Sequence, residues 1–178
     1  MADNNNKELR FNSGNAFCIM EDDGITPYYF GKLLGGKLSE VEGSTPVVFG
    51  DGTEFEGPGT VKCSFNVTIT QCTNENISKI NALAGELRKA FYKNGKNVQG
   101  DEQDIYIPEL KIKRSKELEM KGQTLQTIII EGSCAPQDAD IQITPSDVMP
   151  EGFATKEVTD PVTSNSRFYC APEKLAGA

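Results

Sequence analysis

The side chains of this sequence that could do chemistry are few, and their spacing does not assemble a reaction centre. The chain has no histidine, so it lacks the imidazole that most often transfers protons or binds metal ions near neutral pH. A cysteine nucleophile would need activation by a lysine or a helix end, and Cys63 falls on the apolar face of an alternating run, where a thiol is usually inert. The sequence therefore predicts no enzymatic activity, no catalytic residue and no cofactor.

Two further patterns resemble ligand-binding sites but fail in their details. Residues 31–38 have the glycine and lysine spacing of a phosphate-binding loop, yet Leu38 stands where the hydroxyl that binds Mg²⁺ belongs. A glycine-permitted bend in a strand is the better interpretation. The acidic residues at 21–23, and Asp138 with Asp140, could offer oxygen ligands, but no twelve-residue calcium loop surrounds either group. We predict solvated acidic turns rather than a metal site, with cation binding as the alternative.

Composition narrows the remaining classes of function. The 178 residues include 26 acidic and 18 basic side chains, a net charge of -8, which disfavours sequence-specific nucleic-acid binding because phosphate contacts need clustered cations. No secretory signal or membrane-spanning stretch is recognisable, so we expect synthesis in a cytoplasm and no membrane partner. The five cysteines are scattered and contain no Cys-x-x-Cys pair, so we expect them to be reduced and mostly buried.

Charge is unevenly distributed along the chain. Residues 111–121 hold five basic and two acidic side chains, whereas residues 131–160 hold seven acidic and one basic, and residues 21–56 hold eight acidic and two basic. One interpretation is an ordinary solvated surface. The other is self-complementarity, in which a basic edge of one copy meets an acidic edge of the next. On the second interpretation the candidate interface residues are Phe49, Phe55, Lys111, Lys113, Arg114, Asp138 and Asp140.

The elements that must position these residues are mostly strands. Residues 61–70 alternate between apolar and polar side chains over ten positions, which predicts a long half-buried strand. Residues 45–49 predict another strand, followed by an Asp51 to Gly52 turn. Residues 54–59 are too rich in glycine and proline for a central strand and carry Phe55, so we expect a protruding loop or hairpin tip there.

One helix and several further strands complete the expected fold. Apolar residues at helical spacing predict an amphipathic helix over about residues 76–93, begun by Asn74 or Asn76 and ended at residues 94–95. Further strands are expected at residues 16–20, 28–30, 125–133 and 105–113, the last with Pro108 at an edge or bulge. We expect a core domain over residues 1–134 and an extended carboxy-terminal segment or arm over 135–178, with a strand fragment at 141–143, packing on the same domain or on a neighbour.

These features together resemble the tail tube (major tail) proteins of long-tailed bacteriophages. The resemblance lies in the run from Gly57 to Thr70, the helix after it and the strand at 125–133. It implies a mainly β protein with one amphipathic helix, a β-sandwich or barrel of tail-tube type with a protruding hairpin loop and an extended C-terminal arm. It further implies hexameric rings that stack into a hollow tube of the virion, in contact with other virion proteins and often acidic inside so that DNA slides without sticking. Residues 44–59 and the segment after 135 match the regions that make the contacts between rings.

Three classes of function remain open at this stage. The first is a virion structural protein, as a tail tube by preference or otherwise as a capsid decoration or connector protein. The second is a β-barrel binding module for a small apolar ligand, although the prolines in the last quarter disfavour evenly spaced strands there. The third is a histidine-free enzyme, for which no two candidate groups share a site.

Overall fold

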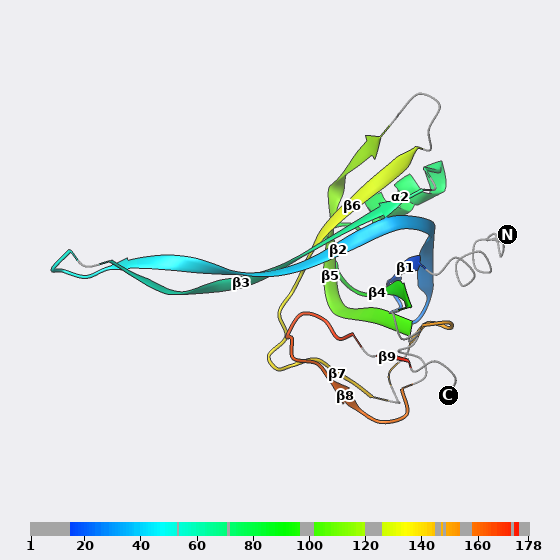
Figure 1. Ribbon diagram of the computed structural model, residues 1–178. Helices are drawn as coiled ribbons and strands as arrows, with labels where there is room; N and C mark the ends of the chain where they lie inside the picture. The colour runs from blue at the N-terminus through cyan, green and yellow to red at the C-terminus, as the bar shows by residue number, and fades with distance from the viewer. Residues whose placement is uncertain are drawn as a thin grey trace.

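The computed structural model describes residues 15–52, 54–70, 72–96, 102–119, 126–144, 147, 149–153, 158–171 and 173–174. Within these residues the fold is mainly β with one helix, as the sequence predicts (Figure 1). The elements are β1 (Asn15–Met20), β2 (Pro27–Val48), β3 (Glu54–Ile69), α2 (Asn74–Leu83), β4 (Leu87–Lys96), β5 (Glu102–Glu119), β6 (Thr127–Cys134), β7 (Gln142–Ile143), β8 (Val162–Thr163) and β9 (Glu173–Lys174).

The large sheet closes on itself as an antiparallel barrel. Its strand order is β4-β1-β2-β3-β6-β5-β9, and a further pairing of β4 with β5 joins the two sides. Strand β1 therefore lies between β4 and β2, with Phe17 opposite Tyr92. Closure satisfies the backbone groups that a sheet edge would otherwise expose.

The predicted strand features are found at the expected places. The alternation over residues 61–70 forms the barrel part of β3, in which Cys63, Phe65 and Val67 are buried. The predicted strand at 105–113 pairs with the one at 125–133, as β5 and β6. Its register against β4 shifts between Ile107 and Leu110, so Pro108 sits at a bulge, where a missing N–H is tolerated.

Strands β2 and β3 continue past the barrel as a long hairpin. Figure 1 shows the two strands leaving the barrel together and running far beyond it. β3 stops pairing with β6 at Cys63, which lies opposite Glu40, so residues 41–48 of β2 pair with β3 alone. The hairpin turns at residues 49–52, where the Gly52 amide donates to the Phe49 carbonyl at 2.9 Å and Gly52 has φ +84°. The expected protruding hairpin and its Asp-Gly turn are thus both present. The prediction of a loop or hairpin tip at residues 54–59 is wrong, because these residues are the first part of β3 and pair with β2.

The sequence predicts a helix that is longer than the one in the structure, and it predicts the wrong N-cap residue. Helix α2 ends at Leu83, and β4 begins at Leu87, where the prediction continued the helix to residue 93. Gly85 has φ +94°, a backbone conformation that terminates a helix and that glycine adopts readily. At the start, the N-cap is Thr73, whose hydroxyl accepts a bond from the Asn76 amide at 3.1 Å.

Two apolar cores lie on the two sides of the barrel wall. The first fills the barrel and includes the aromatic stack of Phe17 with Phe30, whose ring centroids are 5.5 Å apart. The second lies outside β1, β4 and β5, where residues 141–170 cover Met20, Phe91 and Tyr106. Burying one large apolar side chain of this kind contributes roughly 2–3 kcal/mol.

The described part of residues 135–178 packs against the same domain (Figure 1). Backbone bonds join Tyr106 to Cys170 in both directions, at 2.7 and 2.9 Å. The buried ammonium of Lys93 donates to the Gly152 carbonyl at 2.6 Å. A small sheet of β7 and β8 includes the predicted strand fragment at 141–143.

Candidate subunit interface

The end of the hairpin presents apolar side chains to solvent. Val48 is 63% exposed and Phe49 is 53% exposed. They lie at the turn of the hairpin, and the end of the hairpin lies far from the barrel (Figure 1). Phe55 lies in β3 opposite Val47, and its side chain lies outside the described residues. An exposed aromatic residue at the end of a projecting element is typical of a surface that another chain covers.

The basic candidate residues lie on the outside of β5. Lys111, Lys113 and Arg114 are all exposed. The Lys113 ammonium lies 2.8 Å from a carboxylate oxygen of Glu131 on β6, with both side chains about half exposed. Such a surface ion pair contributes at most about 1 kcal/mol, so Lys113 remains available for a stronger partner.

The acidic candidate residues lie beside the base of the hairpin. Asp138 and Asp140 are exposed, and Asp140 lines a cleft of about 360 Å³ together with Glu40 and Val61. The Ser166 hydroxyl donates to a carboxylate oxygen of Glu40 at 3.0 Å, and the Arg167 guanidinium donates to the Gln137 carbonyl at 2.6 Å. The first contact holds the C-terminal segment against the base of the hairpin, and the second joins two parts of that segment.

The structure does not bring the candidate residues together within one chain. The exposed Phe49, the basic group on β5 and the acidic pair belong to three different parts of the surface. Their role in contacts between copies remains a prediction. The sequence patterns also did not single out Lys37, Lys62 and Glu42, which lie on β2 and β3; Glu42 is opposite Val61, which lines the same cleft as Asp140. Residues 38–42 show no alternation of apolar and polar side chains, so only the strand register shows which face each side chain occupies.

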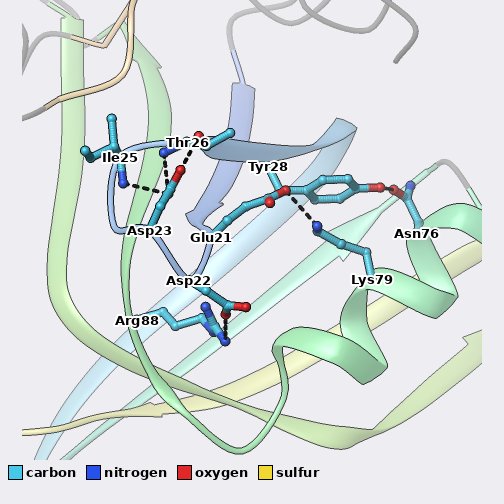
Figure 2. A network of polar contacts seen from close by, with 9 residues as sticks. All are labelled: Glu21, Asp22, Asp23, Ile25, Thr26, Tyr28, Asn76, Lys79 and Arg88. Carbon is cyan, nitrogen blue, oxygen red and sulfur yellow. Dashed lines mark hydrogen bonds and ion pairs between the residues drawn. The ribbon is translucent and has the colours of Figure 1, made fainter. Parts of the chain in front are cut away.

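A polar network fixes helix α2 to the turn between β1 and β2 (Figure 2). Asp23 accepts bonds from the Ile25 and Thr26 amides at 2.9 and 2.8 Å and from the Thr26 hydroxyl, and these bonds lower the pKa of Asp23 to about 2. Arg88 lies 2.5 Å from Asp22, and Lys79 lies 2.6 Å from Glu21. Each carboxylate of this acidic turn therefore already has a partner.

Tyr28 and Asn76 form the buried end of this network (Figure 2). The Tyr28 hydroxyl donates to the side-chain oxygen of Asn76 at 2.8 Å, and the Asn76 amide group donates to the Phe30 carbonyl at 3.3 Å. Burial, together with the nearby carboxylates of Glu75 and Glu21, raises the pKa of Tyr28 to about 12. The network positions the helix and offers no group free for chemistry.

The cysteines show no reactive arrangement. All five are free thiols, and only Cys72 among them is partly exposed. Cys63 and Cys134 lie opposite each other on β3 and β6, and their mutual hydrogen bond together with burial raises the pKa of Cys134. A neutral buried thiol is a poor nucleophile.

An apolar cavity opens at the barrel. It has a volume of about 350 Å³, and its lining combines Lys37 with the apolar and aromatic residues Leu38, Phe65, Tyr92, Ile105 and Tyr169. Gly36 forms part of its wall, and a Cβ there would lie 2.8 Å from the Tyr92 ring. In the part of the chain that the structure describes, no group of three or more acidic or cysteine side chains is placed to hold a metal ion. No helix among the described residues is long and apolar enough to cross a membrane.

Comparisons with known proteins give partial structural likenesses. No protein-family model matches the chain, and no curated protein matches it. A chain in the tail of an empty gene transfer agent particle, refined with C6 symmetry, is 11% identical with a TM-score of 0.46, over 67% of this chain and 90% of that one. A chain of the sheath–tube complex of the extracellular contractile injection system PVC is 10% identical with a TM-score of 0.44, over 67% and 82%. A chain of the anti-feeding prophage baseplate is 8% identical with a TM-score of 0.46, over 66% and 86%.

Proposed function

We propose that this protein is a virion structural protein whose copies assemble into stacked rings and form a phage tail tube through which DNA passes. The hairpin beyond the barrel is the observation that carries the proposal. A two-stranded ribbon is only marginally stable by itself in water, and this one exposes Val41, Val48 and Phe49. Packing against neighbouring copies would stabilise the ribbon and bury these side chains.

The overall charge supports the same role. A net charge of -8 repels the phosphate backbone, so a wall built from such subunits lets DNA pass without holding it. We propose hexameric rings, contacts with other virion proteins and no catalytic activity. The protein would be made in the host cytoplasm and function in the virion. A capsid decoration or connector protein would share the self-association and differ in the shape of the assembly.

Electron microscopy of the purified full-length chain tests the proposal. We expect rings or tubes in negative stain and a mass by light scattering that rises with concentration above the 19.4 kDa of one chain. A monodisperse species with the mass of one chain at every concentration would contradict self-assembly. Closed shells or single rings that never stack would favour a decoration or connector protein.

Matched variants connect this experiment to the hairpin. We expect a double variant, Val48→Ser with Phe49→Ser, to lose assembly while keeping its thermal unfolding temperature, because both side chains are exposed in the single chain. Ile25→Ser is the control, since Ile25 is 62% exposed on a turn away from the hairpin. Loss of assembly in both variants would indicate a general effect of surface polarity rather than a hairpin contact.

The apolar cavity favours one second candidate, a binding module for a small apolar ligand. Its volume of about 350 Å³ is at the lower end of the range for ligand pockets. Gly36→Ala would narrow it against Tyr92. A fluorescent apolar dye that binds the native protein with one-to-one stoichiometry, and binds the Gly36→Ala variant less well, would support this second function.

A further inference from the structure

Among the described residues, the C-terminal segment covers one side of the outside of the barrel. The described part of residues 141–170 covers Cys18 and Met20 on β1, Phe91 on β4 and Tyr106 on β5. Strands β2, β3 and β6 have exposed outer side chains, and their central row consists of Ser39, Ser64 and Ser133, which lie directly opposite one another. Short hydroxyl side chains in one row make this part of the sheet flat, so another chain can approach its backbone closely.

This uncovered face combines exposed apolar and basic residues. Val41 is 59% exposed opposite Lys62, and Leu87 is 51% exposed opposite Lys111. Lys37 lies one row from Ser39 on the same face, because alternate residues of a strand point to the same side. We call Lys37, Val41, Lys62, Leu87, Lys111 and Lys113 the outer sheet face. Among the carboxylates of the face, Glu131 already pairs with Lys113, and Glu86 and Glu109 lie beside Leu87 at its edge.

The opposite side of the same hairpin is acidic. Glu40 lies opposite Cys63, and Glu42 lies opposite Val61, so both point away from the side that carries Lys37 and Lys62. Asp140 lines the same cleft as Glu40, and Asp138 is exposed two residues earlier. We call Glu40, Glu42, Asp138 and Asp140 the hairpin underside. Arg167 is the one cation that lines this cleft.

We propose that the outer sheet face of one copy docks on the hairpin underside of the next copy. The partner is a second copy of this chain because it provides the complementary charge, on the reverse side of the same two strands. Charge complementarity of this kind sets orientation and register, and the exposed Val41 and Leu87 add apolar area at the contact.

The two surfaces differ, so the contact is head-to-tail and leaves one face of each kind free at the ends. Such a contact propagates into a ring or a filament and does not stop at a dimer. The inference rests on the proposed function, since it names the surfaces through which the tube grows.

Charge-reversal variants test the contact. One variant carries Lys37→Glu, Lys62→Glu and Lys111→Glu, and a second carries Glu42→Lys, Asp138→Lys and Asp140→Lys; all six positions are exposed. Each variant alone would oppose like charges, and we expect the concentration needed for assembly to rise by about a hundredfold. An equimolar mixture restores opposite charges at every contact, so we expect it to assemble as an alternating polymer. The control is the first set changed to arginine, which keeps the charge and should assemble normally.

The outcomes separate this contact from the proposed function. Tubes formed by the wild type and equally by both reversed variants would overturn the contact and leave the tube in place. A wild type that forms single rings that never stack would contradict the tube, and rescue by mixing would then still support the contact, whereas closed dimers would contradict both. A wild type that stays monomeric contradicts both. If the lysine variant assembles normally but loses retention of double-stranded DNA on a filter, the outer sheet face serves nucleic acid and the contact is wrong.

Discussion

Replacement of Gly59 by alanine should separate the two strands of the hairpin without unfolding the barrel. Gly59 lies where the register between β2 and β3 shifts, between Glu42 and Ser44. A Cβ on Gly59 would lie 1.5 Å from the Gly43 carbonyl oxygen, whereas carbon–oxygen contacts are normally about 3.3–3.6 Å. The two strands would have to separate by about 2 Å at this point, which is too far for the backbone hydrogen bonds beside it.

The size of the effect follows from what the hairpin contributes. Two or three cross-strand hydrogen bonds at about 1 kcal/mol each give a local loss of about 2–3 kcal/mol. The part of the hairpin beyond the barrel can open without unfolding the barrel. The global free energy of unfolding therefore falls by no more than the free energy of this local opening, which is small. Val48 and Phe49 would then lose their fixed position relative to the barrel.

Two measurements on Gly59→Ala check this reasoning. Denaturant unfolding should give a midpoint close to that of the wild type, while negative-stain microscopy should show no tubes. Gly50→Ala is the matched control, because a Cβ on Gly50 at the hairpin tip meets nothing within 4 Å. Normal tubes from Gly59→Ala would refute the role of the hairpin, and a collapse of global stability would refute its independence from the barrel.

Two further predictions concern the polar network and the buried tyrosines. Asn76→Ala should lower the free energy of unfolding by about 1–3 kcal/mol, because the Tyr28 hydroxyl and the Phe30 carbonyl lose a buried partner. Urea unfolding measures this change, and Ser78→Ala on the exposed face of α2 is the control. Equal unfolding midpoints for the two variants would contradict the prediction. Burial raises the pKa values of Tyr28 and Tyr106 from 10.0 to about 12, so the folded state retains these protons longer than the unfolded state. Their contribution to stability is complete below pH 10 and is lost as the pH rises towards about 12, and thermal unfolding across this range should show a steeper decline for the wild type than for a double phenylalanine variant.

The sequence predicts the elements that have one buried face, and fails where both faces are buried. Apolar and polar residues alternate over residues 61–70 because the inner face of β3 is buried and apolar and the outer face is exposed to solvent. In β4, by contrast, Ala90 and Tyr92 point into the barrel while Phe91 lies under the C-terminal segment. The strand therefore shows no alternation, and Leu87 and Phe91 fall by coincidence at helical spacing.

The C-terminal segment is the part that local patterns could not place. Its apolar residues, such as Ile141 and Phe153, are separated by prolines and loops, so no period indicates which face they cover. Their partners Met20 and Tyr106 lie far away in the sequence. The candidate interface has the same limit: residues 111–114 could be found from their charge, whereas Lys37 and Lys62 join them only through the pairing of β2 with β3.

The length of the free ribbon sets how far one copy can reach. Residues 41–48 extend beyond the last pairing of β3 with β6, which corresponds to about 26 Å at about 3.3 Å per residue. This reach is defined by a number of residues, so it can be shortened by deleting opposite residues from both strands. Removing one pair would turn Val48 and Phe49 to the other side of the ribbon, because side chains alternate. Only even deletions preserve the side on which the tip presents its apolar residues, so the spacing between copies can change only in steps of about 7 Å.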